Sequence, residues 1–154
     1  MSAVLARPDP VLPSRFGYLM GLYAENFHRL NRLFPLAGLL PGVYHSSVDD
    51  GMDVHLAVHE RQPWTMDLEL SYALIDHATG LKTPSAQLRV YLDARVAEAM
   101  HCEPGKCLWQ VLGPLPRSRT VMQHRLRMAS FLNRWLEYLA EQGHSQGTLA
   151  PAVP

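Results

Sequence analysis

A regular alternation of apolar and polar residues between positions 52 and 72 constrains the fold more than any other feature of this sequence. The segments MDVHLAVHE and WTMDLELSY place apolar residues at nearly every even-numbered position, and AQLRVYLDA repeats the pattern. Successive side chains of a β-strand point to opposite faces, so this pattern predicts antiparallel strands that bury only one face. The residues predicted to point inward are Met52, Val54, Leu56, Val58, Trp64, Met66, Leu68, Leu70, Tyr72, Leu88, Val90 and Leu92.

Two segments with helical spacing of apolar residues flank the predicted strands. The first follows Ser14, a suitable N-cap, and ends before Pro35, which cannot continue a helix. The second begins at Thr120, which can cap it, and stops at Gly143. Their apolar stripes contain Phe16, Leu19, Met20, Tyr23, Phe27, Leu30 and Phe34, and Met122, Leu126, Ala129, Leu132, Leu136 and Leu139, the latter widened by Phe131, Trp135 and Tyr138.

A one-faced sheet and two amphipathic helices bury one another, which indicates an α+β fold. We expect a single antiparallel β-sheet of four or five strands, packed on one face by an N-terminal and a C-terminal α-helix. Residues 43–48 predict the first strand, with Asp50-Gly51 as a hairpin turn, and residues 107–112 predict the last one. Residues 94–101 fit either a helical turn or a further strand.

The remaining segments predict the domain organisation. Three prolines and no periodicity indicate a loose arm at residues 1–13. Residues 14–143 then form a single α+β domain, and residues 144–154 form a disordered tail.

Composition narrows the class of protein. The formal net charge is zero, which argues against a general nucleic-acid binder. No apolar run is long enough for a membrane span, and the start of the chain lacks the apolar region of a secretory signal. We therefore expect a soluble, cytoplasmic protein with no membrane or nucleic-acid partner.

The charges are nevertheless segregated along the chain. Residues 49–76 carry seven acids and one base, whereas residues 106–134 carry six bases and no acid. The simplest interpretation is that the two segments lie near each other and neutralise one another. A self-complementary homodimer and an anion-binding strip are the alternatives.

The stretch HCEPGKC, residues 101–107, invites a chemical interpretation. Four residues separate Cys102 from Cys107, whereas a redox C-x-x-C motif has two intervening residues. A zinc site would need ligands beyond these cysteines and His101. Across a Pro-Gly turn the two cysteines could approach disulfide distance, but in a reducing compartment we expect two thiols and no disulfide.

Polar residues on the outer face of the predicted sheet are further candidates. His55 and His59 lie four residues apart on a strand, roughly 13 Å, which is too far for both to bind one metal directly. His55 with Asp67 or Glu69 on the next strand is a better metal-ligand set. The simpler interpretation is a solvated sheet face, and the same holds for Arg89, Tyr91 and Asp93.

Four spaced blocks resemble a known family. NFHRLNRLFP, ERQPWTMDLEL, LRVYLDARVAEAM and FLNRWLEYLAEQG occur in the order found in the YqiB-like bacterial family of unknown function. The residues that fit its pattern are Asn26, Phe27, Leu30, Arg32, Leu33 and Pro35; Glu60, Trp64 and Thr65; Arg89, Tyr91, Asp93, Ala94, Val96, Ala97 and Glu98; and Phe131, Leu132, Trp135, Leu136, Leu139 and Gly143. Leu92 replaces a histidine of the family, and Gln123-His124 replace an acidic pair. The resemblance implies no established activity, only a weak connection with nucleotide metabolism.

Three hypotheses for function follow. The first is a non-enzymatic module that binds a small ligand or a protein, because no phosphate loop, metalloprotease motif or nucleophile elbow is present. We expect no cofactor for such a module, and a homodimer is possible. The second is a hydrolase or other enzyme acting on an anionic, nucleotide-like metabolite, with Asp93 and Glu98 as acid and base and Arg89 as anion clamp. The third is a metal-binding protein. The candidate binding residues are Glu60, Trp64, Arg89, Tyr91, Asp93, Glu98, Arg125 and Arg127.

Overall fold

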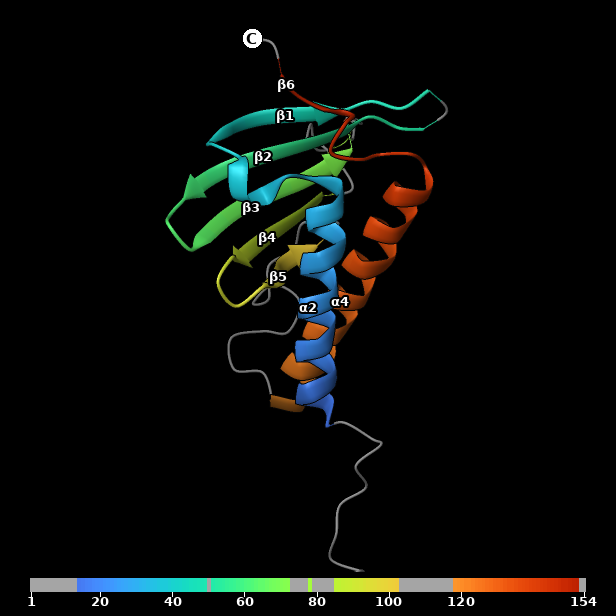
Figure 1. Ribbon diagram of the computed structural model, residues 1–154. Helices are drawn as coiled ribbons and strands as arrows, with labels where there is room; N and C mark the ends of the chain where they lie inside the picture. Colours follow the sequence, from blue (N-terminus) through green and yellow to red (C-terminus); the bar gives the residue numbers. More distant parts are fainter. Residues whose placement is uncertain (1–13, 50, 73–77, 79–84, 103–117, 153–154) are drawn as a thin grey trace, which may run out of the picture.

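One antiparallel sheet and two long helices on one of its faces make up the fold (Figure 1). The computed structural model describes residues 14–49, 51–72, 78, 85–102 and 118–152. The helices are α2 (Arg15–Leu33) and α4 (Ser118–Glu141), and a short 3-10 turn, η1 (Leu36–Gly38), follows α2. The strands are β1 (Gly42–Ser46), β2 (Val54–Arg61), β3 (Thr65–Tyr72), β4 (Ser85–Tyr91), β5 (Val96–Cys102) and β6 (Leu149–Pro151). The predicted α+β class is confirmed.

The described sheet has six strands in the order β5-β4-β3-β2-β1-β6, so the expected four or five strands are too few. Strands β1 to β5 follow one another as neighbours, and each pairs antiparallel with the next. The segment that fitted either a helical turn or a strand contains a turn and then β5. At this turn Arg95 has a positive φ of 57°, which ends β4 and lets the chain reverse.

The sixth strand lies where a disordered tail was expected. Strand β6 pairs antiparallel with β1, with Ser46 opposite Leu149 and Tyr44 opposite Pro151. His144, the first residue of the expected tail, is buried. The disordered tail is therefore wrong for residues 144–152, because residues 149–152 bond to β1 and the side chain of His144 is packed. The expected strand at residues 107–112 and the N-terminal arm lie outside the described residues.

The predicted inward face of the sheet forms one side of the hydrophobic core. All predicted inward residues within the strands are buried, and they pack against Phe27, Leu30, Leu132 and Leu136 of the two helices. Two residues contradict the alternation: Met52 and Trp64 are exposed, Trp64 to 64%. Both residues lie before the first residue of their strands. The alternating pattern in the sequence therefore extends beyond the strands themselves.

Three of the four helix ends lie where the sequence predicts them. The Ser14 hydroxyl accepts a hydrogen bond from the Gly17 N–H at 3.0 Å, and α2 stops two residues before Pro35. Helix α4 starts at Ser118, so Thr120 lies in its first turn and is not the N-cap. Its other end is a Schellman motif, in which the N–H groups of Gly143 and His144 reach back to carbonyls of the last turn, each at 3.1 Å.

Two predicted features of the helices and the first hairpin need correction. Phe16, Met20, Phe131 and Tyr138 belong to the predicted apolar stripes but are exposed. Strands β1 and β2 form the predicted hairpin, but Ser46 pairs with Val54, so residues 47–53 connect them. This connection is longer than a two-residue turn, and Asp50-Gly51 lies at its middle in the sequence, as predicted. Neither described helix is both long enough and apolar enough to cross a membrane.

Replacing Gly143 by alanine is expected to lower the free energy of unfolding by about 1 kcal/mol, because its φ of 104° is unfavourable for any residue with a Cβ. The new methyl would meet only a methyl of Val48, at an ordinary 3.7 Å, so the cost is conformational. Gly21→Ala is the control, since it lies inside α2 in open space and should stabilise by up to about 1 kcal/mol. Urea unfolding of both variants measures this, and equal shifts would contradict the prediction.

Candidate functional site

The outer face of the sheet carries the charged residues that the alternation predicted there. Arg89 of β4 donates to Asp67 of β3 at 3.0 Å, and the two residues are direct partners in the sheet. The bond to Asp67 is the largest cause of a raised pKa of Arg89, and contact with Tyr91 adds to it. His59 lies 3.1 Å from Glu69. These pairs are solvent-accessible, which limits what each contributes to stability.

A bulge in β2 lies at His59, the histidine that pairs with Glu69. The register shifts between Val58 and Glu60, so His59 and Glu60 together face the single residue Asp67. His55 lies opposite Ser71, farther along the sheet. The predicted metal-ligand set of His55, Asp67 and Glu69 is therefore not assembled. Within the described residues, no group of three His, Cys, Asp or Glu side chains is placed to hold a metal ion.

Two predicted binding residues, Glu60 and Arg89, line a hollow of about 410 Å³ on this outer face. Its other lining residues are His59, Asp67, Leu68, Gln87, Leu88 and Met100. Trp64 and Tyr91 lie at the same corner of the sheet, since Thr65 pairs with Tyr91. Most of the charges here already have a partner of opposite sign, as expected of a solvated sheet face.

The remaining predicted site residues lie elsewhere and have other partners. Asp93 lies in the turn between β4 and β5, where its carboxylate accepts the N–H of Ala94 at 2.9 Å. Glu98 is opposite Arg89 in the sheet, but its carboxylate accepts from Arg125 of α4 at 2.7 Å. Arg127 is exposed on α4. Asp93, Glu98 and Arg89 thus each interact with a different group. Cys102 ends β5, and Cys107 lies outside the described residues.

The ion pairs also correct the interpretation of the segregated charges. None of the described ion pairs joins residues 49–76 to residues 106–134. Asp67 and Glu69 lie on the outer face of the sheet, whereas α4 packs on the inner face (Figure 1). Within the described residues, the sheet lies between these two acids and α4, so mutual neutralisation through ion pairs is wrong there.

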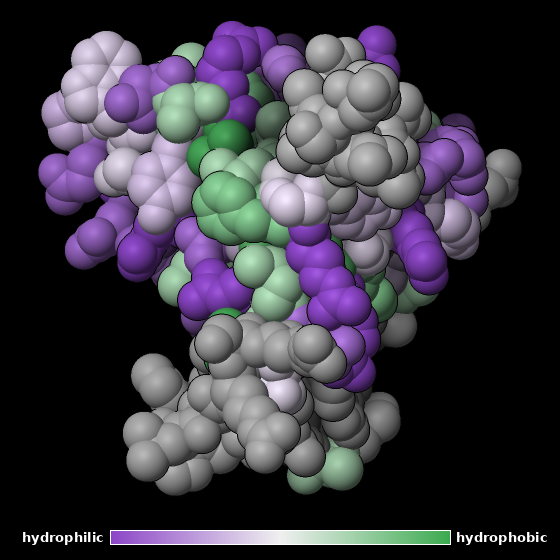
Figure 2. All heavy atoms as spheres, turned by 90° about the horizontal axis from the view of Figure 1, so that it is seen from below, coloured by the Kyte–Doolittle hydropathy of each residue, from purple (hydrophilic) through white to green (hydrophobic). Residues whose placement is uncertain are grey.

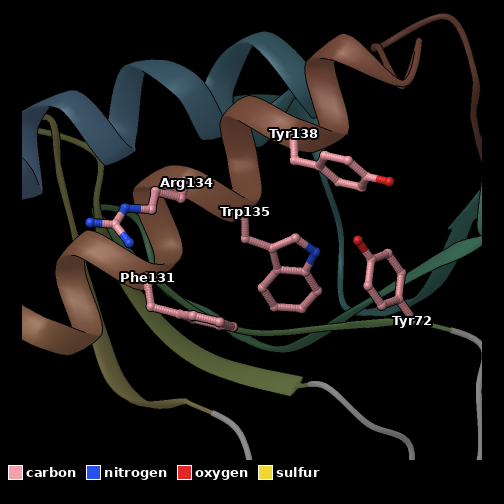
Figure 3. A pocket seen from close by; sticks show the side chains of 5 residues that line it. All are labelled: Tyr72, Phe131, Arg134, Trp135 and Tyr138. Carbon is pink, nitrogen blue, oxygen red and sulfur yellow. The ribbon is translucent and has the colours of Figure 1, made fainter.

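A different site, an aromatic groove, lies where the end of β3 meets α4 (Figure 3). It has a volume of about 360 Å³ and is lined by Tyr72, Phe131, Arg134, Trp135 and Tyr138. Residues 131, 135 and 138 are spaced by four and three, which places them on one side of α4. The centroid of the Trp135 ring lies 5.4 Å from the centroid of the Tyr72 ring and 6.0 Å from that of the Phe131 ring. Three aromatic rings are thus in contact along one wall.

The polar groups of the aromatic groove come from the same residues. Trp135 is 6% exposed, and its buried indole N–H has no hydrogen-bond partner among the described residues. The Tyr72 hydroxyl points toward it (Figure 3) and interacts with it, although the two do not meet hydrogen-bond geometry. Burial, the largest cause, raises the pKa of Tyr72, so this hydroxyl stays protonated at neutral pH. A buried donor without an acceptor is costly and is uncommon in native proteins.

The sequence interpretation did not select these residues as a site. Tyr72 was assigned to the inner face, and the three aromatic residues of α4 only widened its stripe. The sequence did contain a signal: Phe131, Trp135 and Tyr138 make the apolar stripe of this helix wider than burial against the sheet requires. Two of the three remain exposed, which distinguishes this face from core.

Comparison with known proteins gives a family but no function. Residues 29–145 match the family described as "Protein of unknown function (DUF1249)", and the chain belongs to this family. This confirms a family of unknown function, while the narrower YqiB-like name stays a prediction. No curated protein and no solved structure gives a significant match.

Proposed function

We propose that this member of the DUF1249 family is a non-enzymatic module that binds a small, flat, ring-containing molecule in the aromatic groove. The observation that carries the proposal is the indole N–H of Trp135, which is buried in the wall of this groove without an acceptor. A ligand atom with a lone pair would satisfy this donor. The Tyr72 hydroxyl points toward it (Figure 3) but does not meet hydrogen-bond geometry.

The size and lining of the aromatic groove support the same conclusion. Small-molecule sites commonly have volumes of about 300–1,000 Å³, mostly apolar and aromatic walls and a few polar groups. The groove has about 360 Å³, four aromatic side chains and the guanidinium of Arg134. Phe131 and Tyr138 are 41% and 50% exposed, so they offer ring surface that a ligand can bury. Aromatic walls favour flat ligands because rings pack edge-to-face or offset-stacked.

The alternative functions lack a comparable observation. A hydrolase built on Asp93, Glu98 and Arg89 needs these groups free to act on one substrate, but each has another partner. A metal site has no assembled set of ligands among the described residues. The YqiB-like name, the cytoplasmic location and the homodimer stay predictions. Light scattering after size-exclusion chromatography measures the last of these.

Flat heteroaromatic compounds are expected to stabilise the protein in a thermal-shift screen of purines, pteridines and quinoxalines with saturated analogues of equal size. A ligand present at 100 times its Kd and bound only to the native state adds about 2.7 kcal/mol of stability. For a chain of this size that corresponds to a rise of roughly 5–11 °C in Tm. The saturated analogues should give much smaller shifts, because they cannot stack on the rings.

Three variants assign any binding to the aromatic groove. Trp135→Phe keeps a ring but removes the N–H, and should weaken the best heteroaromatic ligand about tenfold. Tyr138→Ser removes an exposed ring from the groove and should also weaken binding. Tyr18 is an exposed tyrosine of α2 outside the groove, so Tyr18→Ser should leave binding unchanged. Saturated analogues that bind as well as flat ones, or unchanged affinity in both groove variants, would contradict the proposal.

A further inference from the structure

A second groove, the α2–α4 groove, lies between the first turns of the two helices. It has a volume of about 540 Å³ and is lined by Phe16, Leu19, Met20, Tyr23, Val121, Met122 and Arg125. Helices α2 and α4 run side by side in the same direction, so both begin at this end of the molecule (Figure 1). The groove shares no residue with the aromatic groove.

The walls of the α2–α4 groove are apolar and partly open to solvent. Phe16 and Met20 are 61% and 38% exposed, although both belong to the apolar stripe of α2. Figure 2, seen from the end where the helices begin, shows hydrophobic residues gathered between hydrophilic ones. Grouped apolar side chains at a surface commonly mark a binding site. Methionine adapts its shape to what it contacts, and Met20 and Met122 lie on opposite helices of this groove.

One end of the groove is polar and carries the guanidinium of Arg125. Arg125 projects from α4, and its Nη1 donates to Glu98 of β5 at 2.7 Å. Burial, the largest single influence, lowers the pKa of Arg125, but its interactions with Tyr23 and Glu98 raise that pKa overall, so the guanidinium stays charged. A guanidinium has five N–H donors in a planar fork. The bond to Glu98 therefore leaves donors with which Arg125 can bind a second carboxylate.

The sequence around this groove favours an anion. The first nineteen residues of α4, 118–136, contain four arginines and no acid. The first ten residues of α2, 15–24, contain one arginine and no acid. The N-terminal ends of both helices add partial positive charge at the same place. Glu98 is the acid that the structure places against Arg125.

We infer that the α2–α4 groove binds a linear amphipathic carboxylate, such as a medium-chain fatty acid. The carboxylate pairs with the guanidinium of Arg125, and the acyl chain lies between the helices against Phe16, Met20 and Met122. This inference is independent of the function proposed for the aromatic groove, because the residues and the ligand chemistry differ. A single acyl chain suits a groove with apolar side walls and one charged end.

Isothermal titration calorimetry of the full chain with dodecanoate, below its micelle concentration, tests the inference. We expect one molecule to bind per chain, with dodecan-1-ol at least tenfold weaker and dodecyltrimethylammonium weaker still. Arg125→Gln should weaken dodecanoate at least tenfold and leave dodecan-1-ol nearly unchanged. Arg127 is exposed and lies two residues after Arg125 on the same helix. The variant Arg127→Gln should therefore bind dodecanoate like the wild type.

A second variant keeps the inference testable if Arg125→Gln does not fold. Met20→Glu places a negative charge in the wall, leaves the Arg125–Glu98 pair intact and should abolish dodecanoate binding, whereas Tyr18→Glu should not. The inference is overturned if dodecanoate does not bind, or if dodecyltrimethylammonium binds equally well. It is also overturned if Met20→Glu binds normally, or if Tyr138→Ser abolishes binding while Met20→Glu does not. Failure of heteroaromatic binding would leave these outcomes unaffected.

Discussion

Replacing Asn26 by aspartate is expected to lower the free energy of unfolding at pH 7 by about 3–5 kcal/mol, the cost typical of an uncompensated buried charge. The Asn26 side chain is 0% exposed and connects the two helices. Its Nδ2 donates to the Ala129 carbonyl at 3.0 Å, and its Oδ1 accepts from Asn133 at 2.9 Å. A carboxylate would set a negatively charged oxygen against the Ala129 carbonyl. A loss of this size is a large part of a typical stability of about 5–15 kcal/mol.

The pH dependence identifies the buried charge as the cause. Burial raises the pKa of the introduced carboxyl above its unfolded value of about 3.9, so the folded variant binds a proton more readily than the unfolded chain. The deficit relative to wild type should therefore be small near pH 4, where a protonated carboxyl can donate to Ala129, and should grow as the pH rises. Urea unfolding between pH 4 and pH 8 measures it.

Asn31→Asp is the matched control for this substitution. Asn31 lies on the same helix, and its side chain is only half-buried, so a carboxylate there keeps contact with water. We expect a change within about 0.5 kcal/mol, as for most surface substitutions. Equal losses at positions 26 and 31, or a deficit at position 26 that does not change with pH, would contradict the role assigned to Asn26.

The second large effect is a loss of stability on acidification through His144. This side chain is 4% exposed and lies at the start of the segment that leads to β6. Its Nε2 donates to the Met52 carbonyl at 3.0 Å, and its Nδ1 lies 2.6 Å from the Ser46 hydroxyl. The neutral ring fits this arrangement, because its Nδ1 accepts a hydrogen bond from the Ser46 hydroxyl. Protonation would place a charge in a buried position.

The direction of the pH effect follows from the pKa of His144. Burial, the largest cause, lowers this pKa below the ordinary 6.5, although the Met52 carbonyl and Asp53 act in the opposite direction. The unfolded chain therefore binds the proton more readily than the folded chain does. The stability that neutral His144 contributes is complete above about pH 6.5 and is lost as the pH falls through the folded pKa. Denaturant unfolding from pH 8 to pH 5 should show this decline in the wild type.

Substitution of His144 separates its effect from that of other groups. His144→Leu should cost about 1–3 kcal/mol at pH 8, because the buried Ser46 hydroxyl keeps Thr148 but loses His144, and the Met52 carbonyl loses the donor Nε2. The same variant should decline less than the wild type between pH 7 and pH 5. His124 also has a lowered pKa, from burial and from Arg127 and Arg125, and accounts for part of any remaining decline. His28→Gln, an exposed histidine of α2, should follow the wild type; identical pH profiles for His144→Leu and wild type would contradict the prediction.

Much of the fold could be predicted because its signals are local. The alternation from Val54 to Val58 and from Met66 to Tyr72 identifies the buried face of the sheet, and the structure confirms it. Ser14 and Gly143 end their helices through bonds that reach at most five residues along the chain. Strand β6 could not be predicted in this way, since three residues show no period and are ordered by pairing with a strand about 100 residues earlier.

The candidate site was predicted less well than the fold. Glu60, Trp64, Arg89 and Tyr91 do lie at one corner of the sheet, because strand pairing brings residues of the same face together. The choice of ionic partners was not predictable. Glu69 pairs with His59, and Glu98 pairs with Arg125 of α4 although Arg89 lies opposite it in the sheet.

 

The sequence by itself determined where strands β1 to β4 and the two helices lie, which face of the central strands is apolar and where each helix stops. These properties depend on neighbouring residues, whose spacing is written directly in the chain. Only the tertiary structure decided that Trp135 meets Tyr72, that Arg125 meets Glu98, and that Asn26 joins the two helices. Those contacts connect residues tens of positions apart, and their partners are selected by sheet register and by helix packing, neither of which a local period encodes.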